Sequence, residues 1–201
     1  MSTTDYEVID LAQQVMDGKK EPAGARMPIK SGGNRSAEMM AGMRPEVCAL
    51  LWALVRSTDA GDRHFALLHL MLTNEMRGFI AADGVKFTKQ SIKTVAKGVA
   101  RSATHQHLYN KGPCKNCKGT GSVRVYGREK SCSTCDGTAA GRWSASDAYR
   151  LAQLDITRQS YQETCARFET HATQLLGDWR AALDEHLYRY FKANQINGFD
   201  Q

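Results

Sequence analysis

Four of the six cysteines in this chain lie in one short segment, as two Cys-x-x-Cys pairs. Cys114 and Cys117 form the first pair, and Cys132 and Cys135 form the second after fourteen intervening residues. Two such turns at this separation are typical of a tetrahedral zinc site with four thiolate ligands. Because four protein ligands leave no open coordination position, we expect one structural Zn²⁺ and not a catalytic one.

A glycine lies two residues after the second cysteine of each pair, at Gly119 and Gly137. Glycine lets the chain turn back so that backbone N–H groups point at the sulfur atoms and disperse their negative charge. A redox-active dithiol is the alternative, but two matched turns favour a metal. The remaining cysteines, Cys48 and Cys165, lie in apolar helical patterns and are expected to be small core residues.

The segment between the pairs, "SVRVYGREKS", alternates apolar and polar residues and has Gly127 at a turn position. This pattern predicts a short β-hairpin that joins two zinc knuckles. A two-stranded hairpin is marginally stable alone, whereas structural zinc contributes about 10–16 kcal/mol in small peptides. The metal, therefore, is expected to hold the zinc-binding module at residues 111–142 together.

Helical patterns flank the module on both sides. Residues 36–110 predict a helical subdomain, in which the first helix is apolar nearly all round and buried. The residues expected to begin or interrupt its helices are Pro45, Asp59 or Asp62, Gly78 or Gly84, and Thr88. Residues 1–35 are rich in Gly, Pro and Lys toward their end and predict a weakly ordered segment, with a short helix from Asp5 to Met16.

Residues 143–201 predict further helices, of which the first two resemble a helix-turn-helix. Ser144 or Ser146 can cap the first, and Thr157 or Asp155 the second. The second helix has an apolar stripe of Tyr161, Cys165, Phe168, Ala172, Leu175, Trp179 and Ala182, and Gly177 is a candidate kink. Arg158, Gln159 and Gln162 lie off that stripe and suit contacts to phosphates and base edges. An ordinary helical hairpin with a solvated polar face is the alternative.

The excess positive charge is concentrated around the cysteines. Residues 101–150 carry nine Lys and Arg against three Asp and Glu, whereas the other 151 residues carry 18 of each, so this stretch accounts for the whole net charge of +6. A focused basic patch indicates an anionic partner, most often nucleic acid. A solubilising surface on a small metal module is the simpler reading.

Several classes of protein do not fit the sequence. It has no apolar run of about 18 residues, and its polar N-terminus is unlike a signal peptide, so we expect a cytoplasmic protein without a membrane partner. We find no phosphate-binding loop, no His-Glu-x-x-His motif and no glycine-framed serine nucleophile. We therefore expect neither an enzyme nor a small-molecule substrate.

The order of these parts resembles the late-gene antitermination Q proteins of lambdoid bacteriophages. The resemblance rests on "GPCKNCKGTGSVRV" and "CSTCDGTAAGRWSASDAYRLAQ": two knuckles around a basic hairpin, then the Ser-Ala-Ser-x-Ala-Tyr-Arg stretch at Ser144 to Arg150. It is best over residues 100–165 and weaker over 45–100. Ala139 stands where a glycine is usual, but it is not a ligand and should not affect metal binding.

This resemblance implies a mainly α fold with an inserted four-cysteine, DnaJ-like zinc-binding hairpin and C-terminal helix-turn-helix-like helices. It implies a protein that binds double-stranded late-promoter DNA and engages paused host RNA polymerase with its sigma factor in the bacterial cytoplasm, so that polymerase reads through terminators. Host elongation factors are candidate further partners. Cys114, Cys117, Cys132 and Cys135 would hold zinc; Arg150, Arg158, Gln159 and Gln162 would face DNA; and Arg124, Arg128 and Lys130 would contact DNA or polymerase.

The zinc domain of DnaJ-type co-chaperones carries the same Cys-x-x-Cys-x-Gly-x-Gly motif. Those domains have four such half-sites, whereas this chain has two, and no proline here follows a histidine as in the His-Pro-Asp motif of a J domain. A peptide-binding chaperone module is therefore the alternative function. It would bind unfolded chains and show little salt-dependent affinity for DNA.

Overall fold

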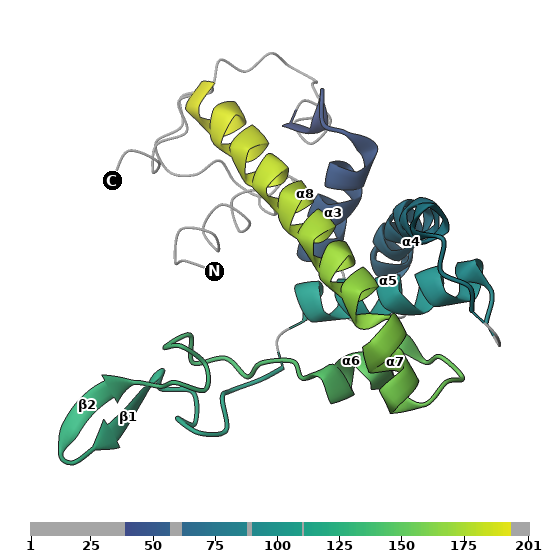
Figure 1. The fold of residues 1–201 in the computed structure, drawn as a ribbon. Helices are drawn as coiled ribbons and strands as arrows, with labels where there is room; N and C mark the ends of the chain where they lie inside the picture. Colours follow the sequence, from purple (N-terminus) through teal and green to yellow (C-terminus); the bar gives the residue numbers. More distant parts are fainter. Residues whose placement is uncertain (1–38, 57–61, 88–89, 110, 194–201) are drawn as a thin grey trace. The chain divides into compact units, whose positions relative to one another are not determined.

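The computed structural model describes residues 39–56, 62–87, 90–109 and 111–193 (Figure 1). These residues are mainly helical, with one small antiparallel sheet and a four-cysteine cluster, as the sequence predicts at this level. The elements in chain order are α3 (Pro45–Arg56), α4 (Arg63–Asp83), α5 (Ile92–Leu108), β1 (Ser122–Val125), β2 (Arg128–Ser131), α6 (Ala145–Ala152), α7 (Arg158–Thr164) and α8 (Ala166–Ala193). The predicted helix from Asp5 to Met16 lies outside the described residues, as does the whole of the predicted weakly ordered segment, residues 1–35.

The chain divides into two compact units, Met1–Leu68 with Leu175–Gln201, and His69–Gln174. In the first unit, α3 begins at Pro45 as predicted and contributes buried side chains such as Leu50 and Leu51. The ring of His186 donates a hydrogen bond to the carbonyl of Met39 over 2.8 Å. No helix in the described part of the chain is long and apolar enough to cross a lipid bilayer.

The boundaries of α4 follow from its flanking residues. The carboxylate of Asp62 accepts a hydrogen bond from the backbone N–H of His64 over 2.6 Å, which satisfies a donor of the first turn. The helix continues through Gly78 and ends before Gly84, whose φ of +74° closes it. The interruption expected at one of these glycines therefore falls at the second.

The second unit contains α4 from His69 onward, α5 to α7, the segment with the four clustered cysteines and the first turns of α8. α5 is capped by Ser91, whose hydroxyl accepts from the N–H of Thr94, and not by Thr88, which lies outside the described residues. Gly98 lets α6 approach α5, because a Cβ at this position would lie 2.7 Å from the side chain of Leu154. α5 and α6 are thereby packed against each other.

The C-terminal helical region differs from its prediction at one point. The single predicted helix is divided at Cys165, which caps α7 and precedes α8. α8 continues through Gly177 without interruption. Its buried positions after Ala172 include Leu176, Trp179 and Leu183. Leu176 and Leu183 therefore take the places in the apolar stripe that the sequence pattern gives to Leu175 and Ala182. The sequence has leucines at both 175 and 176, and spacings of three and four fit a 3.6-residue period about equally well.

A partly buried carboxylate, that of Glu169, joins α5, α7 and α8. Glu169 accepts hydrogen bonds from the hydroxyl of Ser102 over 2.7 Å and from the amide of Gln106 over 2.6 Å. Its other oxygen accepts from the hydroxyl of Tyr161 over 3.1 Å. Since an unpaired carboxylate is costly inside a protein, these three donors are what allow Glu169 to sit among buried side chains. Cys165 is fully buried beside this network, as expected, whereas Cys48 is half-buried.

Candidate metal centre

The four predicted ligands converge in one buried cluster. The sulfur atoms of Cys114, Cys117, Cys132 and Cys135 all lie within 4.8 Å of one another. Sγ of Cys114 is 4.0 Å from that of Cys132, and Sγ of Cys117 is 3.7 Å from that of Cys135. A tetrahedron with Zn–S bonds of about 2.3 Å has edges of about 3.8 Å, whereas a disulfide would need about 2.0 Å. The cluster therefore has the size and chemistry of a four-thiolate site for one tetrahedral metal ion.

The two halves of the cluster have the same local geometry, and we call residues 114–121 knuckle 1 and residues 132–139 knuckle 2. In each, a threonine N–H donates to the carbonyl of the second cysteine over 3.0 Å: Thr120 to Cys117, and Thr138 to Cys135. The knuckles also bond to each other. Two backbone bonds join the end of each knuckle to the start of the other: Cys132 N–H to Gly121 carbonyl at 2.9 Å, and Cys114 N–H to Ala139 carbonyl at 2.8 Å.

Both knuckles use left-handed backbone at the same three positions. The residues with positive φ are Lys118 (52°), Gly119 (87°) and Gly121 (76°) in knuckle 1, and Asp136 (48°), Gly137 (80°) and Ala139 (63°) in knuckle 2. Gly121 is required for a second reason, because a Cβ there would lie 2.6 Å from the carbonyl oxygen of Gly137. The sequence pattern singled out Gly119 and Gly137, but it is Gly121 whose Cβ would meet the backbone of the opposite knuckle.

Hydrogen bonds to the sulfur atoms stabilise negative charge in the cluster. The N–H of Gly121 lies 3.3 Å from Sγ of Cys117, and the side-chain amide of Asn116 lies 3.3 Å from Sγ of Cys132. Burial raises the pKa of the Cys132 thiol, but hydrogen bonds from the N–H of Cys135 and from Asn116 outweigh it and lower that pKa to about 6. The pKa of Cys117 is lowered by the same balance, in which the N–H of Gly121 opposes burial. The thiolate, the form that binds metal, is thus favoured at Cys117 and Cys132, whereas burial raises the pKa of the Cys135 thiol to about 11.

β1 and β2 form the hairpin predicted between the two knuckles, with Val125 opposite Arg128 at its closed end (Figure 1). Val123 packs against the four cysteines, so the side chain of this valine attaches the hairpin to the cysteine cluster. Opposite residues in an antiparallel pair share a face. The register therefore places Arg128 and Lys130 on the same face as Val123, and Arg124 on the other face opposite Glu129. The three predicted contact residues of the hairpin are all exposed, but they do not form one surface.

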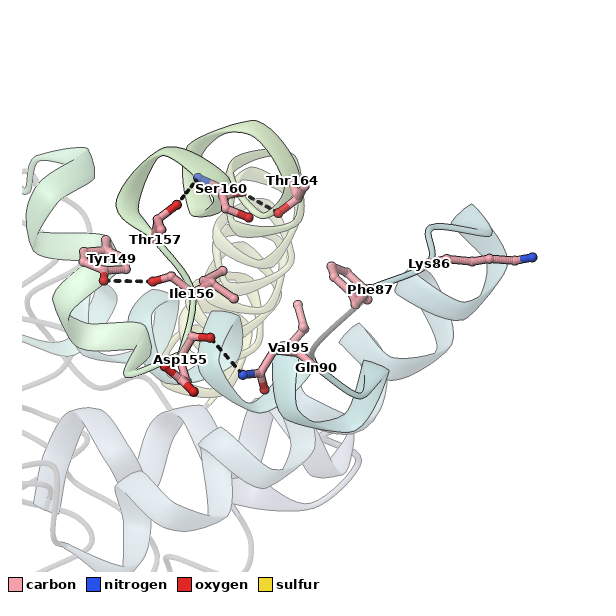
Figure 2. A pocket seen from close by; sticks show the side chains of 10 residues that line it. All are labelled: Lys86, Phe87, Gln90, Val95, Tyr149, Asp155, Ile156, Thr157, Ser160 and Thr164. Carbon is pink, nitrogen blue, oxygen red and sulfur yellow. Dashed lines mark hydrogen bonds between the residues drawn. The ribbon is translucent and has the colours of Figure 1, made fainter.

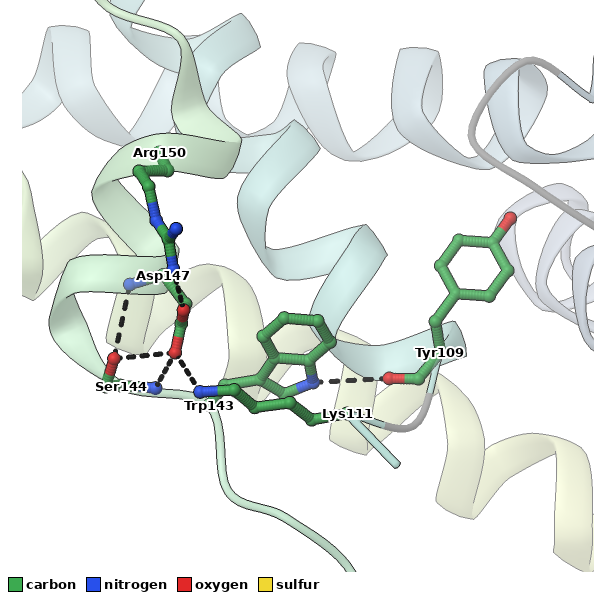
Figure 3. A network of polar contacts seen from close by, with 6 residues as sticks. All are labelled: Tyr109, Lys111, Trp143, Ser144, Asp147 and Arg150. Atoms are coloured by element: carbon green, nitrogen blue, oxygen red, sulfur yellow. Dashed lines mark hydrogen bonds and ion pairs between the residues drawn. The ribbon is translucent and has the colours of Figure 1, made fainter. Parts of the chain in front are cut away.

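Several contacts close the base of the cysteine segment, where it joins α5 and α6. Pro113 and Ala140 form an antiparallel bridge, and the indole N–H of Trp143 donates to the carbonyl of Tyr109 over 3.2 Å (Figure 3). The ammonium group of Lys111 bonds to the carboxylate of Asp147, which belongs to the first turn of α6. The two ends of the segment are thus held together, and the cysteine module is tied to the start of α6.

Asp147 is the centre of this contact. It forms a capping box with Ser144, whose hydroxyl and backbone N–H both bond to its carboxylate, and Arg150 bonds to the other carboxylate oxygen (Figure 3). These donors, first Lys111, then Ser144 and Arg150, hold the pKa of Asp147 well below its usual range. The side chain of Arg150 is still 72% exposed, so its guanidinium can contact a further partner while it remains paired.

The predicted DNA-contacting residues of α7 are all exposed. Arg158 and Gln162 are four residues apart, so they lie on one face of the helix. Gln159 lies beside them, and its amide donates to the carboxylate of Glu163 over 2.9 Å. Arg158 and Gln162 are consequently the pair best placed to meet an anionic partner, because Gln159 is already engaged with an acidic side chain.

Sequence reasoning missed four residues that shape the site: Asn116, Lys111, Trp143 and Asp147. Only Asp147 had a recognisable signal, since an acidic residue three positions after Ser144 matches a capping box. Asn116 is one of two variable residues inside Cys-x-x-Cys, and Lys111 is one of many cations in a basic stretch. Nothing in the spacing of either residue indicates its partner.

A groove of about 530 Å³ lies beside α7 (Figure 2). Its polar side chains are used to hold the turn between α6 and α7: the hydroxyl of Tyr149 donates to the carbonyl of Ile156 over 2.9 Å, and the amide of Gln90 donates to that of Asp155 over 3.2 Å. The hydroxyl of Thr157 caps α7 through the N–H of Ser160. The polar side chains that line the groove therefore fix the backbone of the α6–α7 turn.

Neither models of protein families nor curated proteins give a match to this chain. The interpretation of the site therefore depends on its own geometry and on the order of its motifs. That geometry offers a closed four-thiolate metal site, exposed cations on a hairpin beside it, and a capped pair of short helices tied to its base.

Proposed function

We propose that this protein is a transcription antitermination factor, which binds double-stranded late-promoter DNA, engages paused host RNA polymerase with its sigma factor, and makes it read through terminators. The observation that carries the proposal is the contact between Lys111 and Asp147. It couples the cysteine module to the capped start of α6, within the Ser144 to Arg150 stretch on which the resemblance to the Q proteins depends. A metal module that orients a neighbouring helix pair is what such a DNA-binding protein requires.

In this proposal the metal is one structural Zn²⁺. Four buried cysteines, with no further His, Asp or Glu ligand beside them among the described residues, suit zinc, and tetrahedral sulfur sites take either zinc or iron. Four thiolates around a divalent ion leave a net charge of about −2, which the hydrogen bonds from Gly121 and Asn116 help to disperse. When bound, the ion supplies no chemistry to a substrate. It holds the two knuckles and, through Val123, the hairpin.

DNA is contacted in this proposal through α6 and α7, which act as a helix-turn-helix. The turn between them contains Gln153 in a left-handed conformation (φ 52°), whose amide oxygen accepts from Arg101 of α5 over 2.6 Å. This bond and the groove-side bonds fix the angle at which α7 is presented. The exposed Arg158 and Gln162 then face the bases or phosphates, and Arg150 faces a phosphate next to its Asp147 partner.

A read-through assay tests the proposal. A template with the late promoter of the source phage, its promoter-proximal pause site and a downstream terminator is transcribed by host RNA polymerase with and without the protein. We expect read-through that depends on the promoter segment, and that is reduced about tenfold by Arg158→Ala because one side-chain contact to DNA is lost. The matched control is Arg189→Ala, which removes an equal charge from a surface ion pair with Glu185 on α8.

Two results would overturn the proposal. Termination unchanged by folded, metal-loaded protein that also fails to bind the template would exclude antitermination. Salt-insensitive binding to an unfolded polypeptide in the same preparation would favour the chaperone-type module instead. Equal effects of Arg158→Ala and Arg189→Ala, with read-through intact, would leave the activity standing but exclude α7 as the helix that contacts DNA.

A further inference from the structure

The tip of the hairpin has an unusual composition for its geometry. Only Tyr126 and Gly127 connect β1 to β2, and both have positive φ, 50° and 76°. Two central residues with positive φ define a type I′ turn, which strongly prefers Asn-Gly, Asp-Gly or Gly-Gly. Gly127 fits this preference. A bulky aromatic residue with positive φ is a genuine outlier, so Tyr126 is a poor choice for the local backbone.

Packing does not compensate for the unfavourable backbone of Tyr126. Its side chain is 99% exposed, the largest exposed fraction among the large hydrophobic side chains described. Val123, near the other end of β1, packs against the cysteines, so the hairpin already has its attachment to the core. An aromatic ring that costs backbone strain and contributes no packing points to a contact outside the chain.

The charges around the ring indicate which kind of partner it contacts. Three exposed cations lie on the same hairpin, Arg128 and Lys130 on one face and Arg124 on the other. The single acidic residue of the hairpin, Glu129, already accepts a hydrogen bond from Ser122. An aromatic ring flanked by cations is how proteins bind single-stranded nucleic acid, where bases stack on the ring and cations meet the phosphates. An apolar pocket on a protein would not require cations on both faces of the hairpin that carries the ring.

We propose that Tyr126 stacks on an unpaired base of DNA that has been locally opened, while Arg128 and its neighbours contact the flanking phosphates. The inference rests on the proposed function, in which the protein meets a promoter with polymerase already bound and the duplex open. To stack on a base inside an intact duplex, the ring would first have to unstack a base step, which costs about a few kcal/mol. The metal cluster would keep the tip in a fixed position through Val123 and the bond from Cys132 to Gly121.

The test replaces Tyr126 with the residue that the turn itself prefers. Tyr126→Asn should stabilise the hairpin, because Asn-Gly is favoured in a type I′ turn, and should remove the stacking surface. We expect the metal-loaded, full-length Tyr126→Asn variant to bind a late-promoter duplex with an affinity within about twofold of that of the parent chain. Its affinity for the same duplex with a central unpaired bubble should be about tenfold lower than that of the parent chain. Tyr126→Trp should retain affinity for the bubble. The parent chain and Tyr126→Trp should quench the fluorescence of 2-aminopurine placed in the bubble, whereas Tyr126→Asn should not.

The outcomes separate this inference from the proposed function. If the parent chain binds duplex and bubble equally and Tyr126→Asn changes neither, stacking is excluded while antitermination stands. If Tyr126→Asn leaves both DNA affinities intact and weakens binding to RNA polymerase alone, the ring contacts a protein, and the inference is wrong. If the parent chain binds no DNA, both the inference and the proposed function fail.

Discussion

The two knuckles have the same backbone conformation but different sequences. Comparing them shows which residues the cysteine cluster requires and which positions accept other residues. The bond from each threonine N–H to the second cysteine corresponds in the two knuckles, as do the two bonds between knuckles and the three positive φ angles. At the third of these positions knuckle 1 has Gly121, whereas knuckle 2 has Ala139 with φ 63°. The backbone conformation is therefore imposed by the ligands and by the paired bonds between knuckles, and is kept even where the residue disfavours it.

The knuckles also differ in what surrounds the sulfur atoms. Asn116, between the cysteines of knuckle 1, donates its amide to the sulfur of Cys132, the first cysteine of knuckle 2. The equivalent residue of knuckle 2 is Thr134, whose backbone N–H, not its side chain, bonds to Cys132. Lys118 of knuckle 1 corresponds to Asp136, which pairs with Arg142. Knuckle 1 thus supplies more of the positive environment that four thiolates require.

The largest effect should come from removing one ligand, and it should be the same in either knuckle. Cys117→Ser and Cys135→Ser should each release the metal and unfold residues 111–142, because metal binding and folding of such a module are one event worth on the order of 10 kcal/mol. Metal content of the purified chain, read with a chromophoric chelator, measures this. The half-buried Cys48 is the control, since Cys48→Ser removes a thiol that is not a ligand. Retention of one equivalent of metal by either ligand variant would refute the shared site.

A smaller loss of stability should distinguish Gly121, where a Cβ would collide with the opposite knuckle, from a glycine at which only the positive φ angle matters. Gly121→Ala should cost about 2–4 kcal/mol, because left-handed strain is added to a Cβ placed 2.6 Å from the carbonyl of Gly137. Gly127→Ala is the matched control, since its φ is also 76° but no atom lies within 4 Å of its Cβ. It should cost about 1–2 kcal/mol. Guanidinium-induced metal release compares them, and equal midpoints would exclude the close approach of the knuckles.

The sequence predicts the ligands of this site far better than their surroundings. Cys-x-x-Cys spacing and serine caps are local signals: the spacing predicts the four clustered cysteines, and the cap falls on Ser144, one of the two serines that the sequence offers. The contact of Lys111 with Asp147 joins residues 36 positions apart, and no local pattern carries it. The division of the last helix at Cys165 is missed for a different reason. Its N–H still bonds to the carbonyl of Tyr161, and its carbonyl accepts from Glu169, so the apolar pattern continues through the break.

The two knuckles differ in the hydrogen bonds that they give to the sulfur atoms, and this difference should be measurable as a difference in metal affinity between variants of each knuckle. Asn116→Ala removes the amide that bonds to Cys132 and should weaken metal binding about tenfold, the lower end of what loss of such a hydrogen bond costs a metal site. Thr134→Ala leaves the N–H in place and should change affinity by less than about twofold. Competition of Co²⁺-loaded protein against a chelator, followed by thiolate-to-cobalt absorption, measures both. Equal affinities would show that the two knuckles contribute equally to the sulfur environment.

The smallest effect should be a gain in stability, and it should come from making knuckle 2 more like knuckle 1. Ala139→Gly relieves the strain of a Cβ in left-handed backbone, worth about 1–2 kcal/mol, but gives the unfolded chain more freedom, which costs about 0.4–1 kcal/mol. We expect a net stabilisation of about 0.5–1 kcal/mol, seen as a higher guanidinium midpoint for metal release. Its N–H and carbonyl are kept, so the bond from Cys114 to residue 139 should persist. A lower midpoint would mean that Ala139 is not strained in solution, and that the two knuckles do not share one backbone at their third position.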